Sequence, residues 1–194
     1  MQFLMSDSEG SRVLLINVKN KEYKNGVTIS FLIDFWKLGL KDYFKTPHRI
    51  KYVANTYPQV FEQITKEEAL KYLVRGYTIA KKVGTPIMPE CKTWLEAFGV
   101  TKYKTKGSLY KCYLCDEEDL TQEQVERILE VAKKELKTGV AGTPQEEPLE
   151  ENCKICENEI KKVEKDLISK YRKNERIEDK KEIDYLIDYF EKNA

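Results

Sequence analysis

Four of the five cysteines fall in two Cys-x-x-Cys pairs, Cys112 with Cys115 and Cys153 with Cys156. Four thiolates in two close pairs form the ligand set of a structural tetrahedral zinc site. The interval between the pairs, residues 116–152, is longer than in a common zinc ribbon. A disulfide-type crosslink and unconnected core cysteines therefore stay open as alternatives to zinc.

The two pairs lie in different kinds of predicted element. If residues 109–115 form a regular strand, Cys112 and Cys115 point to opposite faces, so zinc binding would require a local turn there. Cys153 and Cys156 at a helix start share one face, where the helix dipole favours thiolate. The fifth cysteine, Cys91, begins a short predicted helix, and we expect a small buried residue there.

Two carboxylates and the only histidine follow a predicted strand, at Asp34, Asp42 and His48. Such groups can hold a hard divalent cation that activates water, as in a metal-dependent nuclease or phosphodiesterase. The structural alternative is that Asp34 caps a turn, Gly39 supplies a bend and Asp42 pairs with a lysine. No nucleophile elbow, phosphate-binding glycine loop or H-E-x-x-H pattern is present, which favours a non-enzymatic role.

Cations alternate with aromatic residues in two stretches of the N-terminal part. The candidate nucleic-acid contacts in these stretches are Lys41, Lys45, Arg49, Lys51, Tyr52, Lys104 and Lys106. Lysine and arginine neutralise phosphates while aromatic faces stack on exposed bases, as in many single-strand binders. The alternative is a Lys-rich surface with half-buried strand tyrosines. We expect an accessory protein that binds RNA or single-stranded nucleic acid; a structural or regulatory protein-interaction module is the other non-enzymatic possibility.

The formal net charge of +1 conceals a division along the chain. Residues 1–115 hold 19 Lys/Arg and 10 Asp/Glu, residues 116–150 hold 4 and 11, and residues 151–194 hold 11 and 12. The front is therefore basic, which suits a polyanionic partner, and the middle is acidic. Charged residues make up 35% of the chain against about 25% in ordinary proteins, a bias that suits a thermophile or an AT-rich genome.

The hydrophobic pattern predicts an α+β fold, a small antiparallel sheet packed with helices and followed by a C-terminal helical hairpin. Residues 12–18 and 27–33 are β-branched runs joined by an Asn-Gly turn signal, which indicates a hairpin. Thr65 and Glu68 form a capping box for a helix that ends at Gly84. We also predict an irregular or partly stranded connection over 41–57, a short helix over 91–98 and a strand over 109–115. A later helix should begin after Asp119 or Thr121 and carry one apolar face, formed by Val125, Ile128, Leu129, Ala132 and Leu136.

Glycines, prolines and glutamates concentrate in residues 139–148, which we interpret as a linker. It separates a basic α+β domain over residues 1–138 from a charged helical hairpin over residues 149–194. Apolar residues recur at helical spacing in this tail, and short helices need a partner for such a stripe. We therefore expect the tail to self-associate or to dock on a protein.

The segments Phe31-Leu32-Ile33-Asp34 and Leu38-Gly39-Leu40-Lys41-Asp42 carry a resemblance to a known pattern. They are similar to the strand-end motif V-D-x-x-x-L-G-x-K-D of a widespread group of conserved bacterial proteins. The resemblance extends over about residues 12–137, but the tail and both Cys-x-x-Cys pairs are not part of the pattern, so it lends the zinc site no support. It implies no activity, since this family has no function to transfer.

The chain offers no run of about 18 apolar residues for a membrane span, and residues 1–5 lack the features of a signal peptide. Five cysteines, an odd number that includes two Cys-x-x-Cys pairs, fit a reducing compartment better than a secreted disulfide scaffold. We therefore expect a cytoplasmic protein without membrane contact.

Overall fold

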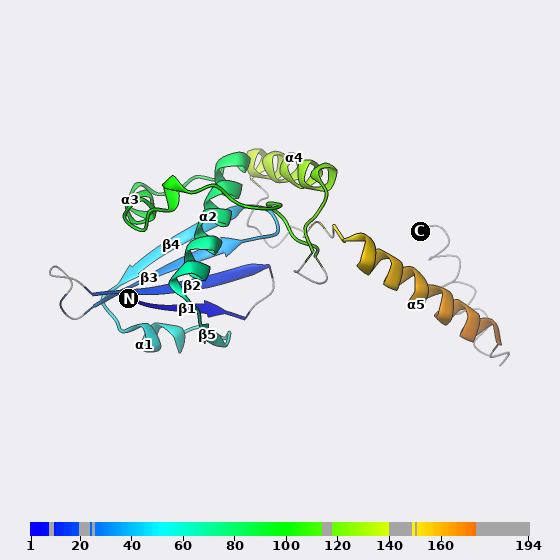
Figure 1. Cartoon of the computed structure of the whole chain (residues 1–194), viewed down its shortest axis with the longest axis horizontal. Coiled ribbons are helices and arrows are strands. Elements are labelled where there is room, and N and C mark those ends of the chain that lie inside the picture. Colours follow the sequence, from blue (N-terminus) through cyan, green and yellow to red (C-terminus); the bar gives the residue numbers. More distant parts are fainter. Residues whose placement is uncertain are drawn as a thin grey trace. The chain divides into compact units, whose positions relative to one another are not determined.

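The computed structural model describes residues 1–7, 10–19, 24, 26–113, 118–139, 149 and 151–173. The chain divides into two compact units, Met1–Glu151 and Asn152–Ala194. The first unit holds the sheet and four α-helices, and the second contributes one long helix (Figure 1). Among the described residues, no helix combines the length and the apolar character that a membrane crossing requires.

Five antiparallel strands form one sheet in the order β4-β3-β2-β1-β5. They are β1 (Gln2–Ser6), β2 (Ser11–Val18), β3 (Val27–Asp34), β4 (Gly39–Thr46) and β5 (Phe61–Gln63). The predicted hairpin is present as β2 and β3, where Leu14 pairs with Phe31 and Ile16 with Ile29. The predicted α+β class is confirmed, because a single antiparallel sheet packs with helices.

Six helical elements complete the described chain: α1 (Ile50–Ala54), α2 (Lys66–Val83), α3 (Pro89–Ala97), the 3-10 turn η1 (Val100–Lys102), α4 (Gln122–Thr138) and α5 (Lys154–Lys173). The capping box of α2 is formed as predicted, since Thr65 Oγ1 accepts the Glu68 N–H and the Glu68 carboxylate accepts the Thr65 N–H. Gly84 ends α2 in the left-handed conformation. Thr121 begins α4 through an equivalent box with Gln124.

Helices cover both faces of the sheet. On one face, Leu4, Val13 and Leu15 contact Ile50 and Val53 of α1. Side chains alternate along a strand, so the neighbouring residues face the other side, which α2 crosses (Figure 1).

Two glycines allow α2 to lie directly on the sheet. A Cβ at Gly39 would lie 2.3 Å from the carbonyl oxygen of Gly76, and one at Gly76 would lie 2.5 Å from Cγ2 of Ile33. Gly39 also has a φ of 72°, which disfavours any side chain there. The position of α2, and of every residue it carries, therefore depends on this close contact.

One local prediction was right in part and another was wrong. The connection over 41–57 is partly stranded, as predicted, since β4 extends to Thr46, but it also holds the helix α1, which was not predicted. Residues 109–113 do not form a sheet strand: the backbone makes an isolated bridge between Lys111 and Asp119. Tyr110 is buried there, and its hydroxyl donates to the Lys37 carbonyl 2.8 Å away. This side chain and a few backbone hydrogen bonds, such as that from the Leu120 N–H to the Tyr110 carbonyl, hold the segment.

The predicted faces of the later helices are present where the structure describes them. Val125, Ile128, Leu129 and Ala132 are buried on α4. The first helix of the predicted tail is α5, whose Ile160, Val163 and Leu167 are 38–57% exposed. The second helix of the predicted hairpin and linker residues 140–148 lie outside the described residues.

Candidate anion-binding cleft and cysteine cluster

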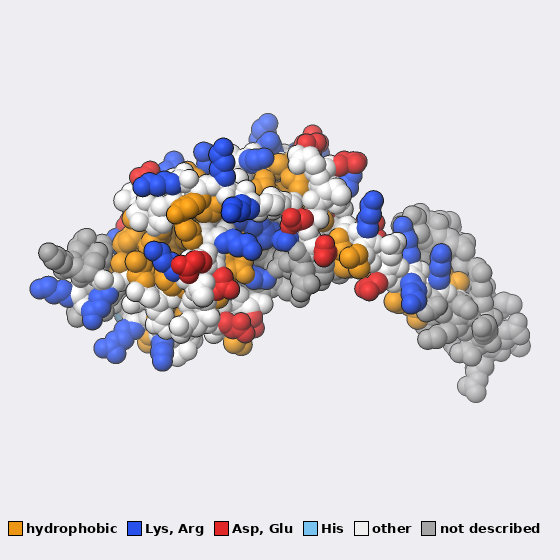
Figure 2. Space-filling view, in the orientation of Figure 1, with side chains coloured by type: hydrophobic (Ala, Val, Ile, Leu, Met, Phe, Trp, Pro, Cys, Tyr) orange, Lys and Arg blue, Asp and Glu red, His pale blue; other side chains and the backbone are white. Residues whose placement is uncertain are grey.

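A cleft lies between α2 and the segment that follows η1. Its first hollow has a volume of about 730 Å³. Cations line it from three places: Arg12 on β2, then Lys66, Lys71 and Arg75 on α2, and finally Lys104, Lys106 and Lys111 on the segment. Figure 2 shows Lys and Arg side chains gathered over this part of the surface.

Only two acidic residues, Glu67 and Asp119, belong to the described lining of the first hollow. Asp119 is already engaged, because its Oδ1 lies 2.8 Å from Lys111 Nζ and its Oδ2 accepts the Ser108 N–H. The hydrogen bond from Lys111 lowers the pKa of the Asp119 carboxyl. Seven cations against two carboxylates leave the hollow strongly positive, and a concave surface concentrates such a field.

The two arginines of the first hollow are held by aromatic and backbone groups. Arg75 Nε donates to the Leu109 carbonyl at 2.7 Å, and its guanidinium lies 4.7 Å from the centre of the Phe35 ring. The Arg12 guanidinium lies 5.9 Å from the centre of the Tyr72 ring. Cation–π contacts of this kind fix the charges in place, so binding an anion would cost little ordering of these side chains.

A second hollow of about 590 Å³ lies beyond the first along α2. Lys81, Lys82 and Lys104 line it, and none of its described lining residues is acidic. The two hollows share Tyr103, Lys104, Thr105 and Ser108. Segment 103–108, which carries these shared residues, therefore separates the two hollows.

The hydroxyl of Thr105 ties this separating segment to α2, because it donates to Thr78 Oγ1 at 3.0 Å. Thr78 in turn donates to the Val74 carbonyl at 2.7 Å within the helix. Lys71 and Arg75 precede this crossing point on α2, and Lys82 follows it. Spacings of four and seven residues place these three cations on one helix face.

Of the predicted nucleic-acid contacts, the structure brings only Lys104 and Lys106 into the cleft. Lys41 and Lys45 are on β4, where Lys45 pairs with Glu90 of α3. Arg49, Lys51 and Tyr52 belong to α1 and its start, on the opposite face of the sheet from α2.

Sequence reasoning missed Arg12, Lys66, Lys71 and Arg75 as cleft residues. The four-residue spacing of Lys71 and Arg75 on a well-capped helix was an available signal. For Arg12 on β2 no local pattern was available, because only the packing of α2 on the sheet brings it to the cleft.

Asp34 serves the turn between β3 and β4. Its Oδ1 accepts the N–H groups of Trp36 and Lys37 at 2.9 and 3.0 Å, and its Oδ2 accepts that of Leu38 at 3.2 Å. Burial raises the pKa of the Asp34 carboxyl, and these three donors oppose the rise. The contacts favour the structural interpretation of Asp34, because its oxygens are occupied by the backbone.

The other two catalytic candidates have local contacts of their own. Asp42 Oδ1 accepts the Tyr43 N–H at 2.7 Å. His48 is exposed, and its ring centre lies 5.0 Å from that of Tyr52. Within the described part of the chain, no hydrogen bond shown for Asp34, Asp42 or His48 joins one of the three to another.

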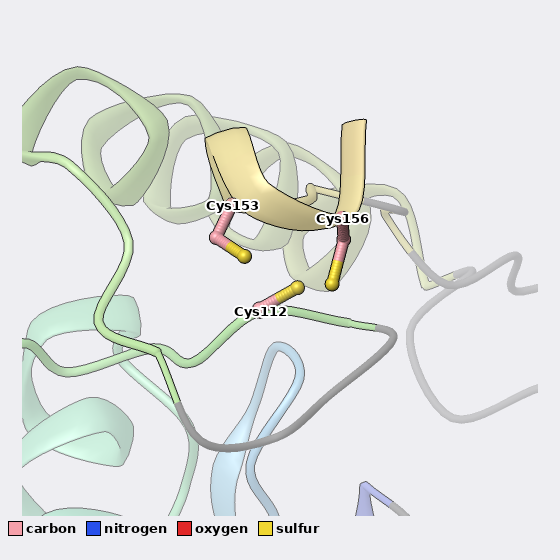
Figure 3. A group of neighbouring side chains, drawn as sticks. All are labelled: Cys112, Cys153 and Cys156. Atoms are coloured by element: carbon pink, nitrogen blue, oxygen red, sulfur yellow. The ribbon is translucent and has the colours of Figure 1, made fainter. Parts of the chain in front are cut away.

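Three of the four predicted metal ligands form a cluster. The Sγ atoms of Cys112, Cys153 and Cys156 all lie within 4.8 Å of one another, and the side chains point toward a common centre (Figure 3). Among the described residues these three cysteines form no disulfide, and Cys112 and Cys153 are buried. The cluster could hold a metal ion. Cys115, the predicted fourth ligand, lies outside the described residues.

Short-range contacts position the cysteines. The Cys112 N–H donates to the Glu118 carbonyl at 2.9 Å, and the Tyr113 N–H donates to the Glu151 carbonyl at 3.0 Å. Cys153 follows Glu151 by two residues, so the covalent chain keeps it within reach of Cys112. The Glu157 N–H then donates to the Cys153 carbonyl, which starts the helical turn that brings Cys156 to the same side.

Arg127 donates to both carboxylate oxygens of Glu151, with Nε–Oε1 at 2.8 Å and Nη2–Oε2 at 3.0 Å, and these hydrogen bonds lower the pKa of Glu151.

Cys91 is buried on α3, and burial raises the pKa of its thiol to about 12. Cys91 is therefore a protonated core residue at neutral pH, in line with its predicted structural role.

Comparison with protein-family models, with curated proteins and with solved structures finds no match to this chain. Its function therefore has to be inferred from its own residues.

Proposed function

We propose that this protein binds RNA or another single-stranded nucleic acid in the cleft along α2. One observation supports this most directly: seven cations and two carboxylates surround an open hollow of about 730 Å³. Phosphates that enter it would release counterions, which is the main driving force of polynucleotide binding. Tyr103, which is exposed at the same surface, offers a ring face to bases.

The test measures the affinity of a fluorescent oligouridylate for the full chain at several salt concentrations. We expect the affinity to fall linearly with salt on logarithmic axes, with a slope of roughly −0.7 for each phosphate neutralised. Lys71→Glu and Lys106→Glu should each weaken binding and reduce that slope, because both lysines line the first hollow.

Lys133→Glu is the matched control, since Lys133 is exposed on α4 and is not part of the cleft lining. Binding that is independent of salt, or equally weakened by all three variants, would contradict a specific role of the cleft.

We also propose that the cysteine cluster holds zinc in a structural role. Thiolates are soft ligands that select zinc over hard cations, and a structural zinc takes four of them or three with histidine. Cys115 remains the proposed fourth ligand. The zinc would join the Cys112 segment to the residues that follow Glu151, which supports the loop that also carries Lys111 of the cleft.

Metal analysis of protein purified under reducing conditions tests zinc directly, and cobalt substitution gives a spectrum that reports the number of thiolate ligands. We expect one zinc for each chain and a cobalt spectrum of tetrahedral thiolate type. Protein that is carefully reduced yet lacks stoichiometric metal would rule out the zinc proposal.

For α5 we propose docking to a protein or to a second copy of the chain, because Ile160, Val163 and Leu167 are exposed at helical spacing. Sedimentation velocity of the full chain and of a Val163→Glu variant tests self-association. A larger species that persists unchanged in the variant would argue against this face as the contact.

A further inference from the structure

Segment 103–108 carries an exposed aromatic side chain between the two positive hollows. Tyr103 is 59% exposed and lines both hollows. Lys104 also lines both. An aromatic ring in contact with both hollows is placed to meet any ligand that passes from one hollow to the other.

The backbone sets the position of this ring. The Tyr103 N–H donates to the Val100 carbonyl at 3.2 Å, where η1 ends. Two residues later, Thr105 is tied to Thr78 of α2 by its hydroxyl. Since Tyr103 is not a core residue, its replacement should leave the fold intact.

The cations continue on both sides of the crossing. Lys71 and Arg75 belong to the first hollow, and Lys81 and Lys82 to the second. From Lys71 to Lys82 the helix rises about 16 Å, at about 1.5 Å for each residue. A strand of several nucleotides is long enough to place phosphates against both Lys71 and Lys82.

We propose that a single strand passes over segment 103–108, with phosphates in both hollows and one base stacked on Tyr103. This inference rests on the proposed function and specifies its ligand as an unpaired strand that spans both hollows. In a duplex the bases are already stacked on one another, so only a terminal base pair has a face on which the Tyr103 ring can stack. The binding site is thus selective for unpaired nucleic acid, with the aromatic ring as the discriminating contact.

Ligand length and strandedness provide the first test. Oligouridylates of increasing length should bind more tightly until the strand spans both hollows, a site size of roughly 4–16 nucleotides for such grooves. A blunt duplex of the same length should compete poorly at equal salt. A dinucleotide that binds as tightly as a 12-mer, or a duplex that competes equally, would overturn the inference and leave anion binding by the cleft in place.

Variants of Tyr103 provide the second test. Tyr103→Ala should weaken binding of the long single strand roughly 5- to 150-fold, as expected for loss of one base–aromatic stack, while the salt slope stays unchanged. Tyr103→Phe should restore most of the affinity, because the ring is kept. Phe44→Ala is the control, since Phe44 is 56% exposed on β4 and belongs to neither hollow.

The two proposals fail in different ways. If Lys71→Glu weakens binding and Tyr103→Ala does not, polynucleotide binding stands and the stacking inference is wrong. If no polynucleotide binds at low salt, both are wrong. Photocrosslinking with a 5-iodouridine strand gives an independent readout, which should attach to Tyr103; attachment only at sites outside both hollows would contradict the path.

Discussion

The Nζ atom of Lys37 lies 2.7 Å from Oε2 of Glu135, a residue 98 positions later in the chain. Lys37 is in the turn between β3 and β4, and Glu135 is in the last turn but one of α4. The Lys37 side chain is 3% exposed and that of Glu135 is 21% exposed. This ion pair links the sheet to α4, together with the Tyr110 hydroxyl on the Lys37 carbonyl.

Replacing one partner of this ion pair should lower the free energy of unfolding much more than replacing both. Glu135→Leu leaves the buried Lys37 ammonium without its carboxylate, and we expect a loss of about 3–5 kcal/mol of unfolding free energy. Lys37→Met should cost less, because Glu135 is more exposed and can hydrate. The double variant should recover most of the loss, as seen by urea unfolding in a double-mutant cycle. Additive losses would show that the pair has no coupling.

The turn after β3 should depend on the Asp34 carboxylate. Asp34→Ala removes the acceptor of three backbone N–H groups, those of Trp36, Lys37 and Leu38. We expect the free energy of unfolding to fall by about 1–3 kcal/mol or more. Asp34→Asn keeps an oxygen for Trp36 and Lys37 and should cost less. Thermal unfolding measures both.

The same variants bear on the enzymatic alternative. If the folded Asp34→Asn, Asp42→Asn double variant loses a metal-stimulated nuclease activity that the parent has, the structural interpretation of these carboxylates is incomplete. We expect no such difference, because the backbone occupies the Asp34 oxygens.

Acid should weaken the attachment of Glu151. Its hydrogen bonds with Arg127 lower the pKa of Glu151 in the folded chain below the ordinary value of 4.5. The native state therefore binds this proton less readily than the unfolded chain. The stabilisation is present above pH 4.5 and is lost as the pH falls through the lowered pKa.

A comparison of the parent with Glu151→Gln checks this pH dependence. Urea unfolding between pH 7 and pH 3 should show a stability difference at neutral pH that narrows in acid. A difference that stays constant over this range would mean that the ionised Glu151 carboxylate contributes nothing.

Metal removal should destabilise the protein. When the free metal concentration is about 100 times the dissociation constant, binding adds about 2.7 kcal/mol to the free energy of unfolding. In a chain of this size that corresponds to a rise of roughly 5–10 °C in the melting temperature. Chelation of the metal, or the Cys153→Ser variant, should lower the melting temperature by about the same amount. Cys91→Ala is the control and should leave the metal content unchanged, because Cys91 is not in the cluster.

Trp36 offers a local reporter of the metal, since its ring centre lies 5.0 Å from that of Tyr113, next to Cys112. In a Trp94→Phe background, chelation should change the fluorescence of Trp36. A melting temperature and a spectrum that are both insensitive to chelator would contradict a structural metal.

The sequence by itself determined the local elements. The β2–β3 hairpin, the capping box at Thr65 and the buried face of α4 follow from signals within a few residues: alternation along a strand, reciprocal capping bonds and helical spacing. The Cys-x-x-Cys pairs were also visible, and three of their thiols meet.

Tertiary structure decided which distant residues meet. Arg12 reaches the cleft only because α2 lies close on the sheet at Gly39 and Gly76, a contact between residues with no shared local pattern. The same packing separates the two halves of the predicted basic surface, since α1 and α2 cover opposite faces of one sheet. Local periodicity specifies which face of an element is apolar, but the partner of that face depends on contacts far apart in the chain, where sequence spacing carries no information.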